Sequence, residues 1–423
     1  MTCPLAIGLD LERACLDRLM AILDATGGYG FDTYDTRVGS LYLNLYHRRA
    51  SNSLADMAMR GLYVAEAIAP IAYRRLRGIR PTWDAMGNSY RANAHVVLAQ
   101  LGDREAHLAA ARDILDQVVA CAVGEPGRRG FALGFRCITG SDKIWSTQVP
   151  VAHYSLRVAR ALMRYQRVSG SDRYAAVLAE CIRFLTEGLP WVEREGCTGV
   201  GYTPADPLQV INIWADVASV LACYDRMQGT VAQQARVAGL TRSILAHLRD
   251  DDTWPYFARW EFKVGDVDNS HTAMVLGALA DLAQCDAGGL RAEIIAALNR
   301  ATPRWLEMFF DEETGRAWNT VDQPRHAYAV TVGDTAYAVL RLARADLGLD
   351  PALRQRLLTL GERNIDWAMS HLRLGNGRFC ERRLGWWRFA VRSIRSFDGL
   401  IADSLALHCA TGQGVDREAL WVV

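Results

Sequence analysis

The feature of this sequence that most constrains its fold is a repeat of about 60 residues. Each copy opens with polar residues and continues as a helix rich in small side chains, and a period of this length fits one pair of helices. The copies start at Trp83, Trp145, Pro207, Val267, Val330 and Ser396. Second helices are expected between them, starting near Glu105, Arg173, Val231, Leu290 and Pro351.

Six helical hairpins predict an all-α toroid of the (α/α)6 type, with a central cleft. A closed ring fits better than an open solenoid because the terminal copies carry no obvious polar cap. An open helical array is the alternative. Since no linker rich in Pro, Gly or Ser divides the chain, we expect residues 1–423 to form a single toroid domain.

Composition excludes several classes of protein. Half of the 423 residues are hydrophobic and the net charge is +1, with both signs interspersed, so a nucleic-acid partner is not expected. The N-terminus lacks the pattern of a secretory signal, and no apolar run is long enough to span a membrane. Ten scattered cysteines are typical of a reducing compartment, so we expect a cytoplasmic protein. The sequence does not determine the oligomeric state.

Motifs for common cofactors are missing from the sequence. There is no Walker A loop, no GxGxxG after a strand and no HExxH, so neither a cofactor nor a structural zinc is predicted. A metal held by Asp, Asn and His from different repeats stays open.

Aromatic and polar residues gather where the inner helices begin. In a ring these ends face one mouth of the cavity. Aromatic faces pack on the C–H surface of a sugar while amides and carboxylates bond its hydroxyls, so an oligosaccharide or polysaccharide is the expected ligand. The residues predicted to bind it are Trp145, His153, Asp206, Asn212, Trp254, Glu261, Asn269 and Asp334.

Two stretches resemble a family of bacterial six-hairpin proteins associated with polysaccharide biosynthesis. They are GYTPADPLQVINIWADVASVLA, from Gly201, and DDDTWPYFARWEFKVGDVDNSHTAMVLGAL, from Asp250. The opening GYGFDTYD and the closing GRFCERRLGWW and RSFDGLIADSLAL are similar to the ends of that family. Its relatives in fold include glucuronyl C5-epimerases, polysaccharide lyases and six-hairpin glycosidases. The resemblance therefore implies a glycan.

The densest group of candidate residues lies between Trp254 and His271. Lysis or C5-epimerisation of a uronic acid must remove a weakly acidic proton beside a carboxylate, which needs a neutralising group, a base and an acid. We expect Asn269 to neutralise the carboxylate, His271 or Tyr256 to take the proton, and Tyr202 to return one. Hydrolysis would instead need two carboxylates, such as Asp268 with Glu261, Asp206 or Asp334.

The same residues have a structural interpretation. Asp268, Asn269 and Ser270 are good helix N-caps, and His271 could be a core histidine. A non-catalytic glycan-binding or scaffold protein is one alternative function. A class II terpene cyclase-like enzyme is another, because Asp266-Val-Asp268-Asn269 faintly resembles the acidic motif of those enzymes.

The arginine-rich stretch from Arg382 to Arg395 could bind an anionic group or a membrane surface. A solvated outer face is the preferred interpretation.

Overall fold

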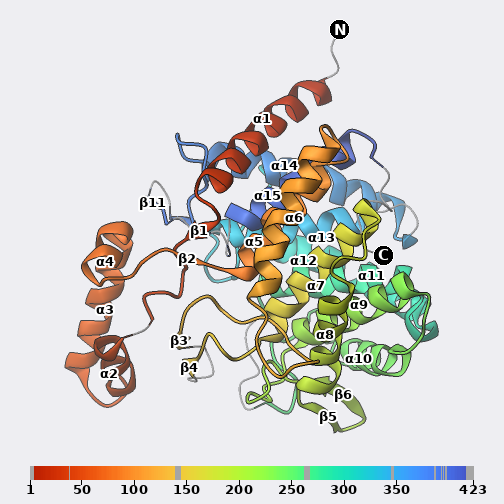
Figure 1. Cartoon of the computed structure of the whole chain (residues 1–423), viewed down its shortest axis with the longest axis horizontal. Helices are drawn as coiled ribbons and strands as arrows, with labels where there is room; N and C mark the ends of the chain where they lie inside the picture. The colour runs from red at the N-terminus through yellow and green to blue at the C-terminus, as the bar shows by residue number, and fades with distance from the viewer. Residues whose placement is uncertain are drawn as a thin grey trace.

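The structure of the chain is a computed structural model, and it describes residues 4–37, 39–138, 144–261, 267–343, 347–384, 387–391, 393, 395 and 398–415. This part of the chain contains fifteen α-helices and a few short strands (Figure 1). None of its helices combines the length and the apolar character needed to cross a bilayer.

Six of the helices form a closed inner ring. They are α5 (Ala85–Leu98), α7 (Ala152–Ser169), α9 (Ile211–Gln228), α11 (Asn269–Gln284), α13 (Ala329–Leu342) and α15 (Gly399–Gly412). Each packs against the next, and α15 packs against α5. Five of the helices begin two to seven residues after the predicted repeat starts, and α13 begins one residue before Val330. The predicted toroid is therefore confirmed, and the open array is wrong.

An outer helix backs each inner one. Five of them are α6 (Arg104–Ala120), α8 (Ala175–Arg183), α10 (Gln234–Ala246), α12 (Arg291–Phe309) and α14 (Pro351–His371), close to where they were expected. A π-helical turn, Phe184–Gly188, extends α8, and a 3₁₀ turn, Ala287–Gly289, precedes α12. The sixth outer helix is α1 (Pro4–Ala25), which packs on α15 (Figure 1). The two ends of the described chain thus combine to complete the last hairpin.

Short antiparallel strands lie in the loops that lead into the inner helices. The pairs are β1 (Tyr29–Gly30) with β2 (Thr82–Trp83), β3 (Cys137–Ile138) with β4 (Ile144–Trp145), β5 (Trp191–Arg194) with β6 (Cys197–Val200), and β7 (Phe310–Asp311) with β8 (Arg316–Ala317). A three-stranded sheet has the order β11 (Trp387–Phe389), β10 (Arg382–Leu384), β9 (His326–Tyr328). Because the pairs close off these loops, they hold the segments before the inner helices at one end of the ring.

Buried charges run along the axis of the ring. Arg160 and Arg164 on α7 bind carboxylates on other inner helices, Asp281 on α11 at 3.2 Å and Asp403 on α15 at 3.2 Å. Arg341 on α13 reaches the same Asp281 oxygen at 3.3 Å. All five side chains are buried. Since a buried charge without a counter-charge is strongly destabilising, these pairs fix how the inner helices lie against one another.

Three further helices lie outside the ring. They are α2 (Ser40–Arg48), α3 (Ser53–Ile68) and α4 (Pro70–Leu76), which pack on one another to the left of the ring in Figure 1 and are called the arm below. The repeat did not predict them. Whether residues 1–423 fold as one unit stays a prediction.

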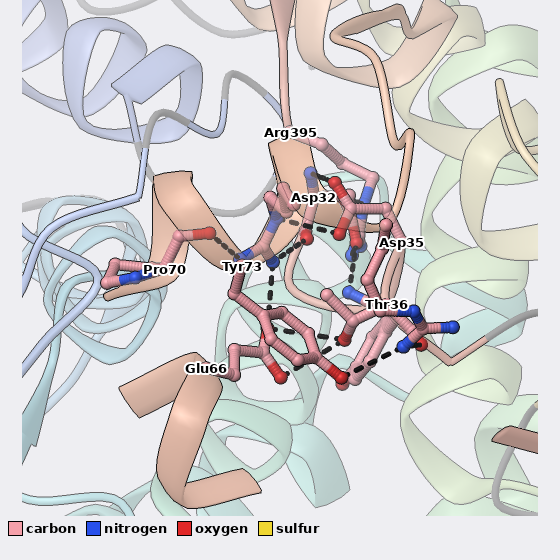
Figure 2. A network of polar contacts seen from close by, with 10 residues as sticks. Asp32, Asp35, Thr36, Glu66, Pro70, Tyr73 and Arg395 are labelled. Atoms are coloured by element: carbon pink, nitrogen blue, oxygen red, sulfur yellow. Dashed lines mark hydrogen bonds and ion pairs between the residues drawn. The ribbon is translucent and has the colours of Figure 1, made fainter. Parts of the chain in front are cut away.

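A buried polar network ties the base of the arm to the ring (Figure 2). Arg74 of α4 is fully buried and binds the carboxylates of Asp35 at 2.8 Å and Glu66 at 2.9 Å. It also donates to the Asp32 carbonyl oxygen at 2.8 Å. Arg395, from the segment before α15, binds both oxygens of the Asp32 carboxylate. The arm is therefore fastened at its base by paired charges.

Candidate functional site

A recess opens where α9 and α11 begin. It is small and is lined by side chains that include Asn212, Trp254, Tyr256, Asp268 and His271. All five were predicted from the sequence to take part in the site. The structure thus brings together residues from two successive repeats.

The Asp268 carboxylate contacts both the backbone and the imidazole of His271. As the N-cap of α11, its Oδ1 accepts a hydrogen bond from the His271 backbone N–H at 2.9 Å. Its Oδ2 lies 2.6 Å from His271 Nδ1. Burial lowers the pKa of His271, but the charge and hydrogen bond of Asp268 outweigh it, so the pKa is raised. Asp268 therefore caps α11 and pairs with the His271 imidazole at once, which leaves Nε2 as the nitrogen of His271 that Asp268 does not bind.

One tyrosine, Tyr256, packs against His271, and a second, Tyr202, lies near Tyr256. The ring of Tyr256 meets the imidazole edge to face, with centroids 4.3 Å apart. Burial, and next the neighbouring Tyr202, raise the pKa of Tyr256. Burial also raises the pKa of Tyr202. Both side chains therefore stay phenols at neutral pH, which suits a hydrogen-bond donor better than a base.

The repeat explains how these tyrosines are positioned. The Tyr202 carbonyl accepts a hydrogen bond from Ala152, the first residue of α7, at 3.0 Å, and the Tyr256 carbonyl accepts one from Ile211, the first residue of α9, at 3.1 Å. Two more loops repeat the contact. The carbonyl of Asn319 binds the first N–H of α11 at 2.8 Å, and that of Glu381 binds the first N–H of α13 at 2.9 Å. Asn319 and Glu381 were not predicted to hold the starts of α11 and α13. Their positions in the repeat, equivalent to those of Tyr256 and Tyr202, could have identified them.

A second histidine lies at the start of α7. Burial, followed by the charges of Arg157, Arg395 and His271, holds the pKa of His153 well below its usual value. Its buried Nδ1 has no hydrogen-bond partner among the described residues. The imidazole of His153 is therefore held in its neutral form at neutral pH. The two histidines thus have pKa values displaced in opposite directions.

Arg157 and Asp334 lie deeper in the ring. With Tyr90, Asp216 and Tyr337 they are among the residues that line a second small cavity. Arg157 binds Asp216 at 3.0 Å. Burial raises the pKa of Asp334 to about 7, against the opposing charges of Arg157 and His271. Asp334 can therefore carry a proton near neutral pH.

Two of the predicted ligand residues are held in place by hydrogen bonds to the surrounding structure. Asn269 is fully buried, and its side-chain amide donates to the Trp318 carbonyl at 2.9 Å while its oxygen accepts from the Trp305 indole at 2.7 Å. It therefore has no exposed atom with which to neutralise a substrate carboxylate. The Trp254 indole donates to the Ile244 carbonyl at 2.9 Å, so Trp254 is anchored in the wall.

Carboxylates predicted for hydrolysis are also engaged by the backbone. Glu261 accepts a hydrogen bond from the Gln209 N–H at 3.1 Å, and buried Asp206 accepts one from the Leu208 N–H at 3.3 Å. Both hold the loop before α9 in place. The side chain of Trp145 lies outside the described residues.

Arg395 corrects the interpretation of the arginine-rich stretch as a solvated face. Only 11% of its side chain is exposed, and it is paired with Asp32. Its guanidinium lies 5.9 Å from the centre of the Tyr154 ring. The Tyr154 hydroxyl is buried and has no hydrogen-bond partner within the described chain. Arg395 thus belongs to the mouth of the ring, beside His153.

Within the described residues, no three His, Cys, Asp or Glu side chains are grouped so as to hold a metal ion. No family model and no curated protein matches the sequence.

Solved structures do match the fold. Cellobiose 2-epimerase from Spirochaeta thermophila is 15% identical, with a TM-score of 0.60 over 78% of this chain and 86% of that one. A family 76 glycoside hydrolase from a bovine Bacteroides thetaiotaomicron strain is 13% identical, with a TM-score of 0.56 over 79% and 70% of the two chains. A polysaccharide lyase is 10% identical, with a TM-score of 0.53 over 79% and 91%. This chain shares the six-hairpin toroid with all three.

Proposed function

We propose that the chain is a carbohydrate-active enzyme that transfers a proton at a carbon atom of a uronic acid within an oligosaccharide or polysaccharide. The observation that carries the proposal is the recess in which the Asp268 carboxylate lies 2.6 Å from His271 Nδ1 and Tyr256 packs against the imidazole, with the pKa values of His271 and His153 shifted in opposite directions. Two titratable groups whose pKa values are shifted in opposite directions in one site are typical of a general acid and a general base.

The roles follow from the protonation states. Neutral His153 takes the proton next to the sugar carboxylate, and His271, kept protonated by Asp268, gives a proton back. Return to the opposite face of the same carbon gives epimerisation, whereas loss of the neighbouring glycosidic oxygen gives lysis. The reaction requires a group that neutralises the substrate carboxylate. We assign this role to the positively charged Arg157 in place of Asn269. Tyr202 and Tyr256 then donate to the substrate.

The names of similar structures are consistent with this class of reaction, since one is an epimerase and one a polysaccharide lyase. Glycoside hydrolysis is the second candidate. It is favoured by the raised pKa of Asp334, which suits a general acid. The terpene cyclase alternative rests on the acidic motif around Asp266, and Asp266 lies outside the described residues.

The test is incubation with a panel of uronic-acid polymers in deuterated water. Epimerisation incorporates deuterium without absorbance, lysis creates an unsaturated uronate that absorbs in the ultraviolet, and hydrolysis releases reducing ends alone. We expect one of the first two signals. His153→Gln and His271→Gln should each lower the rate by about 10²- to 10⁴-fold. His47→Gln, at an exposed histidine of the arm, is the matched control and should have no effect.

The pH profile sharpens the test. The rate should be highest between the lowered pKa of His153 and the raised pKa of His271, since the reaction needs the first neutral and the second charged. Reducing ends without deuterium or absorbance, lost in Asp334→Asn, would instead establish hydrolysis. Binding of a glycan without turnover, unchanged in both histidine variants, would establish a scaffold protein.

We also propose a cytoplasmic location. It is supported by the nine described cysteines, which are all free thiols. Cell fractionation tests it.

A further inference from the structure

The arm carries a concentration of exposed apolar side chains. Of the thirteen large apolar side chains that are strongly exposed in the described chain, seven lie on α2, α3 and α4: Leu41, Leu54, Met57, Tyr63, Val64, Ile68 and Leu76. Scattered exposed apolar residues are normal on a protein surface, but a contiguous group marks an interaction site.

On α3 the exposed apolar residues form one continuous face. Leu54, Met57, Val64 and Ile68 recur at helical spacing, and the small residues Ala58, Gly61 and Ala65 between them are exposed as well. This stripe is about 21 Å long at the usual rise per residue. Leu54 is 69% exposed, Val64 57% and Ile68 63%.

The opposite face of α3 is apolar too, and it is already used. Ala55 and Met59 are buried, and Met59 packs with Tyr42 of α2 and with Leu62. A helix that is apolar on both faces belongs in a buried setting. The stripe is therefore the apolar face of α3 that stays exposed in this structure.

The net charge of the arm indicates what kind of surface covers the α3 stripe. Residues 40–80 contain seven arginines and two carboxylates, a net charge of +5, whereas the rest of the chain carries −4. Arg48, Arg49, Arg75 and Arg80 are exposed, and Arg60 borders the stripe, three residues from Met57 and four from Val64. A second copy docked arm to arm would bring two such positive surfaces together, which like-charge repulsion opposes. An anionic surface is attracted by the same charges.

We propose that the arm docks on the surface of an anionic lipid bilayer, with the α3 stripe inserted at the headgroup boundary and the arginines at the phosphates. An apolar helical face flanked by basic residues is the pattern of helices that lie in a membrane interface. Arginine side chains can place their stems along the apolar layer and their charges in the headgroups. Because the arm is fastened to the ring through Arg74, docking would hold the mouth near the membrane.

The experiment is sedimentation of the full chain with phospholipid vesicles. The chain should sediment with vesicles of phosphatidylcholine and phosphatidylglycerol, remain in solution with phosphatidylcholine alone, and lose binding as salt is added. Leu54→Gln with Val64→Gln should lower the partition coefficient at least about tenfold, from the transfer of two aliphatic side chains. Val231→Gln, at an exposed valine outside the arm, is the matched control and should bind like the wild type.

Thermal unfolding should be the same in all three proteins, because the replaced side chains are exposed. The proposal is overturned if the wild type stays in solution with both kinds of vesicle, or if the double variant sediments like the wild type. A dimer in light scattering that the double variant converts to a monomer would overturn it as well, since a second copy would then cover the stripe.

Discussion

Removing Asp281 should destabilise the ring more than any ordinary surface change. Its carboxylate is completely buried and faces Arg160 at 3.2 Å, Arg341 at 3.3 Å and the hydroxyl of Ser219 at 2.8 Å. Burial already lowers the pKa of Arg341, and Asp281 is the main charge that opposes this. Asp281→Ala would leave two buried guanidinium groups short of a counter-charge.

The expected cost follows from that geometry. Breaking a buried ion pair from one side costs about 3–5 kcal/mol, and two arginines share this carboxylate, so we expect the upper part of that range. This is a large share of a total stability of about 5–15 kcal/mol. Asp281→Asn keeps the volume and a partner for Ser219, so it isolates the loss of charge and should cost nearly as much.

Urea unfolding followed by far-ultraviolet circular dichroism at pH 7 measures the effect. The matched control is Asp17→Ala, which removes the exposed pair with Arg13 and should cost less than about 0.5 kcal/mol. If Asp281→Ala is no more destabilising than Asp17→Ala, the axial charges do not hold the ring and the reasoning fails.

Three further predictions concern the mouth. Asp268→Asn should lower the pKa of His271, because burial then acts without an opposing charge, and a proton NMR titration of the imidazole would detect it. Asp334→Asn should stabilise the fold by up to about 4 kcal/mol at pH 8. The folded-state pKa of about 7 lies above the unfolded value, so the wild type loses stability as pH rises from about 4 to 7, and the gain should vanish in unfolding curves below pH 4. Arg395→Gln should leave the buried Asp32 carboxylate unpaired and cost about 3 kcal/mol in urea unfolding, whereas an unchanged midpoint would show that this pair does not stabilise the fold.

The repeat made the fold predictable from sequence. Its copies start two residues before α5 and α11, because the polar opening of each copy is the loop that caps the next inner helix. The sixth outer helix, α1, could not be identified in this way, since its partner α15 lies at the other end of the chain. The arm was missed because it falls outside the 60-residue period.

The recess was predictable from the sequence because its residues are neighbours in the chain or stand at equivalent helix starts of the repeat. The positions of Asp268 and His271, three apart at a helix start, already suggest both a cap and an ion pair. Arg157, Arg160 and Arg164 follow helical spacing on α7, which by itself is typical of a solvated face. They are buried because carboxylates on distant helices neutralise them, and no local pattern reveals that.

Arg157 connects the stability of the ring to the chemistry of its mouth. It lies one helical turn after His153 on α7, and its charge is the largest electrostatic influence that lowers the pKa of that histidine after burial. Asp216 on α9 binds the same guanidinium at 3.0 Å. A change at Asp216 would therefore alter both the contact between α7 and α9 and the proton affinity of the proposed base. Since α7 carries His153 together with Arg157 and Arg160, a change that moves the proposed base would also disturb the ion pairs that line the cavity.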